Sequence, residues 1–414
     1  MAFTAPTVVA YFDLPAQGGS FFTLDDTTKG VLNSATYVLA GDVGTDISAY
    51  VTFVDIKRGR TNLLEDIPTG VATLQLNNHD RRFDPLYTAG PYYGNLTPKK
   101  KITISVGATL LFVGRVEDWE ADWGVDQDAV ATVTVVDNLG NLAGIEFDEW
   151  TATAAQAPGA RVTAILNRSE VAFPGGARSI DTGVSTLQGD AVSWGSNVLN
   201  YAQLVARSDL GYLFDSREGV LTFRDRHANL NDEATVNFAD TGAAGTVPFH
   251  GIVTRSTSDL LYTSVSVDAE GLTAQTVTDS TAVTNYGASR LALSGLLLNS
   301  TAQALDMANY LLGLYKNPLP AIGSLTVKVH ALDGDVQTTV LSSDLANLAR
   351  VTWTPMGVGD PIDKYGIIEG FAHQIDGREL THEVTFHLSD ANRAAAFTLD
   401  DAQFGILGSS VLAF

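Results

Sequence analysis

The sequence contains no cysteine among its 414 residues. This absence excludes disulfide bonds, thiolate metal sites and cysteine nucleophiles, although it does not identify a cellular compartment. No apolar run approaches the ~20 residues that a membrane-spanning helix needs. We therefore expect no membrane insertion by this chain. The first fifteen residues lack the basic region and the long apolar core of a signal peptide, so no conventional export signal is expected.

Basic residues are scarce. The chain has 25 Lys and Arg against 47 Asp and Glu, a formal net charge of −22. Proteins that sequester nucleic acid need clustered Lys and Arg to hold phosphates, so that class is disfavoured. Two interpretations of the acidic surface stay open. It serves solubility alone, or it repels nucleic acid as the wall of a DNA conduit must.

Common enzyme motifs are missing as well. There is no Gly-rich phosphate loop, HExxH, GxSxG or His-rich metal pattern. His79, Asp80 and Asp84 place a base near carboxylates, but they occupy a polar turn with no serine nucleophile motif nearby. The acidic pairs at 25–26 and 400–401 lack the alternating spacing of a Ca²⁺ loop. We predict no catalytic residue, no metal and no cofactor.

What the sequence does contain is mostly β pattern: short alternating or β-branched segments separated by Gly, Asp, Asn and Pro. Strands are predicted at 8–14, 49–56, 71–76, 101–106, 110–119, 129–136, 221–224, 261–267, 324–329, 349–355, 366–374 and 380–388. Helices are predicted over 159–168, from a Ser196 cap towards Gly211, and over 301–316 before Asn317-Pro318. Asp333-Gly334-Asp335 is predicted to be a hairpin turn.

One peptide occurs near both ends of the chain. Residues 22–34 read FTLDDTTKGVLNS and residues 397–409 read FTLDDAQFGILGS, with eight of thirteen positions identical. Two equal tags are explained most simply by two equal contacts with a symmetric neighbour. The tags supply ten candidate interface residues: Phe22, Leu24, Asp25, Asp26, Leu32, Phe397, Leu399, Asp400, Asp401 and Leu407.

A weaker repeat links two predicted hairpins. Phe112–Val116 and Ile368–Ala372 each carry a glycine inside an apolar run, which is typical of a bulge or a tight barrel bend. With the tags, this repeat indicates a duplicated β module. Five basic residues also stand out in the acidic chain, and we expect them to form ion pairs with an acidic neighbouring subunit rather than bind DNA. They are Arg58, Arg60, Lys99, Lys100 and Lys101.

The segment from Lys57 to Gly114 carries the most specific motifs. Its elements are Arg58-Gly-Arg60, a strand over 70–76, the turn at 77–85 ending in Phe-Asp-Pro, a Gly-Pro-Tyr loop at 90–92, Pro98–Lys100 and the hairpin at 112–114. This order resembles the minor tail proteins of long-tailed phages, particularly those of actinobacterial hosts. His79 stands where that family more often has Arg. The helix and strand within 198–226 are similar to a segment of phage tail hubs, and the resemblance is weakest over 245–320.

The resemblance implies a baseplate or tail-tip hub similar to the trimeric hub of contractile tails. Such a subunit is mainly β with a smaller α/β part, and has two tail-tube-like β-barrel domains flanking a mixed α/β insert. Three subunits then present six barrels, connect a sixfold tube to a threefold tip and line the DNA channel. The implied partners are two further copies, a distal tail protein or tail tube above, and tip, fibre or tape-measure proteins below. The implied place is the virion's tail tip, after assembly in the host cytoplasm.

The expected domains follow from the break near 150–158 and the polar, then Gly/Ala-rich stretch at 229–245. They are an N-terminal arm with its tag (1–45), a first barrel (46–150), the insert (151–240), a second barrel with the helix at 301–316 (241–395), and the C-terminal tag (396–414). Three alternatives stay open: a hexameric distal tail protein, a tail-associated cell-wall hydrolase and a host-receptor adhesin.

Overall fold

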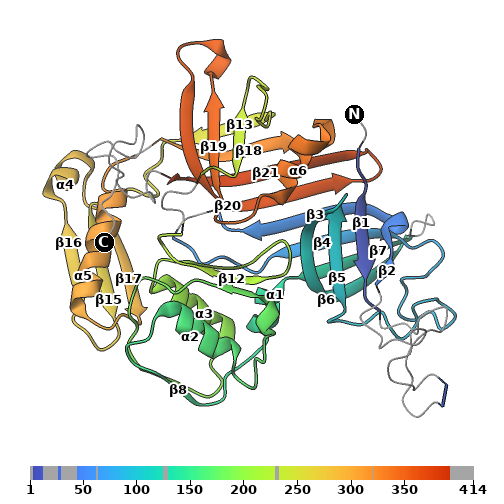
Figure 1. The fold of residues 1–414 in the computed structure, drawn as a ribbon, viewed down its shortest axis with the longest axis horizontal. Coiled ribbons are helices and arrows are strands. Elements are labelled where there is room, and N and C mark those ends of the chain that lie inside the picture. The colour runs from blue at the N-terminus through green and yellow to red at the C-terminus, as the bar shows by residue number, and fades with distance from the viewer. Residues whose placement is uncertain are drawn as a thin grey trace.

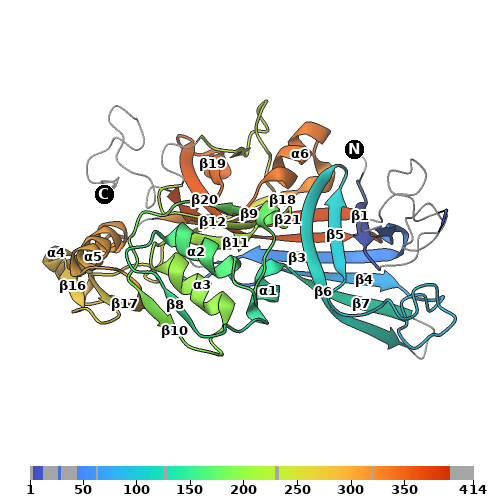
Figure 2. The same cartoon turned by 60° about the horizontal axis from the view of Figure 1, so that its bottom comes forward.

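The computed structural model describes residues 3–12, 27–28, 44–61, 64–124, 129–228, 233–318 and 320–391. Most of the strands belong to one large curled sheet of thirteen strands (Figures 1 and 2). They are β1 (Pro6–Ala10), β2 (Thr45–Asp46), β3 (Val51–Gly59), β4 (Val71–Asn77), β5 (Lys101–Val106), β6 (Thr109–Trp123), β7 (Ala129–Val136), β13 (Val236–Ala239), β14 (Gly251–Arg255), β18 (Ala321–Lys328), β19 (Leu348–Trp353), β20 (Ile362–Asp376) and β21 (Thr381–Asp390).

The core strands alternate between buried and partly exposed residues, as a sheet with one covered face requires. The prediction of a mainly β protein with a smaller α/β part is confirmed. In the part of the chain that the structure describes, no helix is both long and apolar enough to cross a membrane.

The sheet contains one strand order twice. The first half runs β1-β5-β6-β7-β4-β3, and the second runs β13-β19-β20-β21-β18-β14. Numbered along the chain, the six strands of one half match the six of the other one to one. We call these the first module (β1 and β3–β7) and the second module (β13, β14 and β18–β21). One pairing differs, because β1 is antiparallel to β5 whereas β13 is parallel to β19.

A β-bulge fixes how the modules align residue by residue. The bulged residue is Glu117 in β6 and Glu369 in β20, because the pairing with the following strand skips each of them. This alignment puts Gly114 on Gly366. Pairing on the other edge agrees with it, because Gly114 faces Ile102, the second residue of β5, and Gly366 faces Ala349, the second residue of β19. The sequence-based match of Gly114 with Gly370 is therefore wrong by four residues. A period-two sequence pattern puts Gly366 and Gly370 on the same face, whereas the bulge between them places them on opposite faces of β20.

The equivalence extends to unusual backbone. Lys99 and Ala346 both have positive φ angles, 69° and 60°. Lys99 donates its N–H to the carbonyl of Val116 at 2.6 Å, and Ala346 donates to the equivalent carbonyl of Ile368 at 2.9 Å. A left-handed conformation is uncommon outside glycine, so its recurrence at matching positions indicates that the second module repeats the first.

The two modules are joined edge to edge. β3 pairs antiparallel with the second half of β20, from Gly370 to Asp376. The first half of β20, up to Ile367, pairs on the same edge with β19. The two predicted β regions therefore form a single sheet.

Helices and small sheets lie beside this sheet. Between the modules are α1 (Asn138–Ala143), β8 (Trp150–Ala152), α2 (Pro158–Leu166), β9 (Arg178–Ile180), β10 (Asp190–Val192), α3 (Val198–Arg207), β11 (Tyr212–Asp215) and β12 (Leu221–Arg224). Within the second module are β15 (Ser264–Ala269), β16 (Gln275–Thr278), α4 (Ser280–Tyr286), β17 (Arg290–Leu296), α5 (Thr301–Tyr315) and α6 (Gly334–Ser342). α5 packs on β15 and β16 at the left of Figure 1, around a hydrophobic cluster of its own.

Two local predictions need correction. The cap of α3 is Asn197, whose side chain accepts from Asn200 N at 3.0 Å, and not Ser196. Residues 333–335 do not form a hairpin turn, because Asp333 precedes the first turn of α6. Val336 and Val340 lie four residues apart and Leu341 follows, so the apolar spacing after this Asp-Gly pair is helical.

Candidate assembly interface

The ten candidate residues of the two tags lie outside the described residues. They are Phe22, Leu24, Asp25, Asp26, Leu32, Phe397, Leu399, Asp400, Asp401 and Leu407. Of the two repeated peptides, the structure describes only Thr27 and Thr28. The equal-contact prediction for the tags stays a prediction.

Arg58 lies at the junction of the modules. Its side chain is 1% exposed, and its Nη2 lies 2.9 Å from the Asp344 Oδ1. The same nitrogen donates to the carbonyl of Asp215, and the guanidinium carbon lies 5.1 Å from the ring centroid of Phe371 on β20. Arg58 therefore ties β3 to the second module and to the insert of its own chain. It is not presented to a neighbour.

Arg60 makes the second contact at this junction. Its Nε lies 2.9 Å from the Glu369 Oε2, with side chains 10% and 2% exposed. Glu369 also accepts from the hydroxyl of Ser389 at 2.7 Å and from that of Tyr212 at 3.2 Å. The guanidinium stacks 4.9 Å from the Tyr212 ring centroid. Glu369 is thus the centre of a buried network that joins β20 to β21, to β11 and to Arg60, the residue that follows β3.

Two buried carboxylates lie behind the junction. Asp137 accepts from the backbone N–H groups of Gly70 and Leu139, at 2.7 and 2.9 Å. Burial, and then the nearby Asp215, raise the pKa of Asp137 to about 7. Burial likewise raises the pKa of Asp215 to about 6, against the hydrogen bonds from Asn138. Perturbed carboxyls sometimes mark catalysis, but these two hold the start of α1: Asp137 caps the helix, and Asp215 accepts from Asn138, its first residue.

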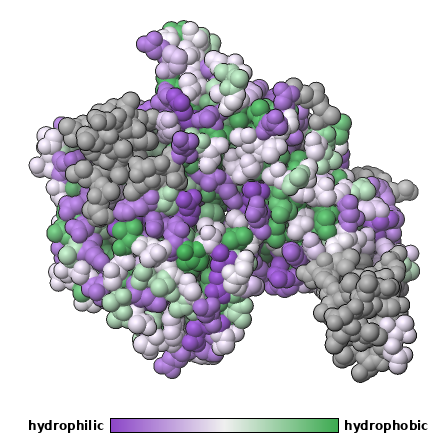
Figure 3. Space-filling model, in the orientation of Figure 1, coloured by the Kyte–Doolittle hydropathy of each residue, from purple (hydrophilic) through white to green (hydrophobic). Residues whose placement is uncertain are grey.

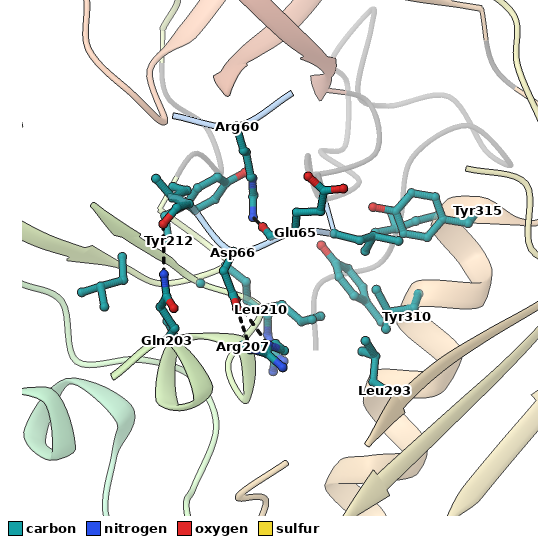
Figure 4. Close-up of a pocket in the computed structure, with 18 residues that line it drawn as sticks. Arg60, Glu65, Asp66, Gln203, Arg207, Leu210, Tyr212, Leu293, Tyr310 and Tyr315 are labelled. Atoms are coloured by element: carbon teal, nitrogen blue, oxygen red, sulfur yellow. Dashed lines mark hydrogen bonds and ion pairs between the residues drawn. The ribbon is translucent and has the colours of Figure 1, made fainter. Parts of the chain in front are cut away.

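A cavity of about 100 Å³ lies where Arg60, residues 64–67, α3 and α5 meet (Figure 4). Its wall is largely leucine and tyrosine, and Figure 4 shows its labelled charged side chains close to one another. Arg207 pairs with Asp66 at 2.5 Å, and Gln203 donates to the Ile67 carbonyl at 3.0 Å. These contacts attach the insert to the first module. Neither the Arg207–Asp66 ion pair nor the Gln203–Ile67 hydrogen bond places a nucleophile beside a general base.

The basic triplet lies beside β6. Lys99 is exposed, whereas Lys100 and Lys101 are half-buried. The Lys101 ammonium lies 4.9 Å from the ring centroid of Tyr11, and Val116 N donates to the Lys100 carbonyl at 2.8 Å. Lys101 is the first residue of β5, and Lys99 and Lys100 directly precede it, so the triplet lies where the pairing of β5 with β6 ends. On the face drawn in Figure 3, hydrophilic and hydrophobic residues are interspersed.

The acids around His79 are held by arginines. Asp80 pairs with Arg82 at 2.5 Å, and Asp84 with Arg81 at 2.7 Å. Burial raises the pKa of Asp84, but hydrogen bonds from Arg81 and from Leu86 N outweigh it, so the net pKa is lowered. Across the described ranges, no three His, Asp or Glu side chains are placed to hold a metal ion.

The residues that build the junction were mostly missed by sequence reasoning. Glu369, Tyr212 and Asp344 carry no motif of their own. A usable signal was the pattern Gly-x-aliphatic-Glu-x-aromatic, which occurs at 114–119 and again at 366–371. Aligning these two stretches locates both bulges, and with them the glutamate that Arg60 meets.

Comparison with known proteins gives a fold. No protein-family model matches the chain, and no curated protein matches it in sequence. Among solved structures, it is similar to a tail protein from Neisseria meningitidis MC58, with a TM-score of 0.58, 10% identity, and 94% of this chain and 97% of that chain covered. It is also similar to the 43 kDa tail protein of prophage MuSo2 from Shewanella oneidensis, with a TM-score of 0.55, 14% identity, and 86% and 98% covered. The chain shares its fold with these two tail proteins over 94% and 86% of its length.

Proposed function

We propose that this chain is a structural protein of a phage tail tip, a homotrimeric hub that connects the sixfold tail tube to the threefold tip. The observation that carries the proposal is the repeated module. Two equivalent six-strand modules per chain give six equivalent modules in a trimer. A ring of six modules is what a sixfold tube needs as its base, and the fold shared with two solved tail proteins supports this role.

The charge of the chain fits a channel wall. A net charge of −22 repels phosphates, so DNA passes such a surface without being held. The junction gives the module pair one fixed arrangement, because a buried network joins Arg60 to β20 and β11. This suits a scaffold on which other proteins assemble. In this proposal, a distal tail protein or tail tube binds above, and tip, fibre or tape-measure proteins bind below. The protein enters the virion during assembly in the host cytoplasm.

Ring stoichiometry tests the proposal. The full chain is purified, its mass is measured in solution, and its rings are counted by electron microscopy, alone and in tails isolated from virions. Three chains per ring at the tail tip are expected. Six chains per ring would make it a distal tail protein instead, and absence from isolated tails would reject a tail function altogether.

A further inference from the structure

Each module has two edges at which a further strand can pair. One is the outer edge of β3 or β14, and the other is the part of β6 or β20 that extends beyond its pairing with β5 or β19. Within the chain, the outer edge of β3 pairs with the second half of β20. The equivalent of β20 is β6, whose first half, up to Arg115, pairs with β5. Among the described residues, no strand pairs with the remaining half of β6 on that edge. The equivalent of β3 is β14, and within the described part of the chain its one strand partner is β18.

The outer edge of β14 and the second half of β6 are the equivalents of the two strands that pair at the junction within the chain. Paired with each other, they would form a second junction of the same kind. We propose that β14 of one copy pairs antiparallel with residues 118–124 of the next copy, which are the second half of β6 and the residue that follows it. The proposal rests on the proposed function, and it names the surface through which the copies associate. One chain carries both halves of this contact, so association is head to tail and closes when the rotation per copy divides a full turn.

The alignment of the modules gives the register. Gly251, Ile252 and Val253 align with residues 53–55 of β3, through the shared pairing with β18 and β4. In the existing junction, residues 53–55 face Asp376, Ile375 and Gln374. Those three align with Gly124, Trp123 and Asp122. The predicted partners are therefore Ile252 with Trp123 and Val253 with Asp122.

Continued regularly, this register places Arg255 opposite Glu120. Both are exposed within one chain. Opposite charges facing each other across a strand pair stabilise it, whereas like charges oppose it. Val253 and Trp123 are 49% and 46% exposed in the single chain, and the new pairing would cover both side chains. The competing explanation is that the charges at these edges only prevent aggregation.

Disulfide trapping tests the register, since the chain has no cysteine of its own. Residues directly opposite in an antiparallel pair have Cβ atoms about 4.5–5.5 Å apart, near the range of a disulfide. The test variant is Val253→Cys with Asp122→Cys. The positive control is Asp55→Cys with Gln374→Cys, which should close within one chain. The out-of-register control is Val253→Cys with Ala121→Cys, because Ala121 points to the other face of β6.

Oxidation of the test variant should give covalent dimers and closed trimers on a non-reducing gel. The Ala121 control should give few. A second variant, Val253→Asp, sets a charge against Asp122 and should weaken each contact between copies by about twofold to fivefold. Its matched control is Val358→Asp, which changes another exposed valine, 74% exposed, away from both edges. Equal effects of these two substitutions would overturn the proposal.

The outcomes separate this inference from the function on which it rests. Trimers by mass without the Val253–Asp122 disulfide, while the Asp55–Gln374 control closes, would overturn the interface and leave the hub intact. Covalent rings of six would support the interface and reject the trimeric hub. A chain that is monomeric at every concentration and forms no interchain disulfide would overturn the interface.

Discussion

Removing the carboxylate of Glu369 should open the junction between the modules. Glu369 is 2% exposed and accepts from Arg60 at 2.9 Å, from Ser389 at 2.7 Å and from Tyr212 at 3.2 Å. In Glu369→Ala the Arg60 guanidinium, 10% exposed, loses its counter-ion but stays away from water. Breaking one side of a buried ion pair costs about 3–5 kcal/mol.

The loss should be concentrated where β3 meets β20, so hydrogen exchange resolved by peptide is the suitable assay. Amides of both strands should exchange roughly 10²- to 10³-fold faster, since each 1.4 kcal/mol is about a factor of ten. The matched control is Asp363→Ala on the same strand. Its pair with Arg350 is 38% and 45% exposed, so the expected cost is at most about 1 kcal/mol.

A double variant completes the test. Arg60→Met with Glu369→Met replaces the pair by apolar side chains and should recover much of the lost stability, because a buried pair contributes little over a well-packed apolar one. If Glu369→Ala costs no more than Asp363→Ala, the network does not hold the junction and the reasoning fails.

Further predictions concern pH, backbone and the tags. Stability linked to the Asp137 carboxyl is present below its unfolded pKa near 3.9 and is lost as pH rises through about 7. From pH 4 to pH 8 the wild type should therefore lose up to about 4 kcal/mol of unfolding free energy relative to Asp137→Asn, which has no carboxyl to titrate, as measured by urea denaturation. Burial lowers the pKa of His382 to about 3, so its contribution is present above pH 6.5 and lost on acidification, and His382→Gln should flatten the acid side of the wild-type curve. Gly59 has φ +83°, and an added Cβ would lie 2.2 Å from the Glu369 carbonyl oxygen, so Gly59→Ala should lower the thermal midpoint more than Gly94→Ala, which meets open space at φ +78°. Deleting residues 398–414 should leave a folded protein by circular dichroism that fails to enter tails, and normal tails from that deletion would contradict the equal-contact idea.

Strands with regular alternation were predicted with the right bounds. Residues 101–106 and 129–136 match β5 and β7 from end to end, because alternation of buried and exposed residues is strongest there. β14 was missed because it is short and lies at the edge of the sheet, where three of its five residues are exposed. An edge strand of this kind has little apolar periodicity for a sequence pattern to detect.

The junction was only half predictable. Arg58 and Arg60 were singled out because they are basic residues in an acidic chain, but their partners depend on pairing between distant strands. Arg60 meets Glu369 at a separation of 309 residues. The repeated pattern singles out this glutamate, but it does not show that Arg60 is its partner. The register of the repeat failed for a related reason. A single glycine in an apolar run does not fix the alignment; the longer pattern shared by 114–119 and 366–371 does, because it includes the bulged glutamate.

The place where the second module is elaborated has an evolutionary consequence. Residues 256–320, with α5 and its own hydrophobic cluster, depart from β14 and return at β18, which are adjacent strands. The first module bridges the equivalent gap with residues 60–70 alone. A segment that starts and ends at neighbouring points can grow, shrink or be exchanged while the strands around it keep their register. Proteins of this fold can therefore diversify at this site while the paired strands of the second module stay as they are.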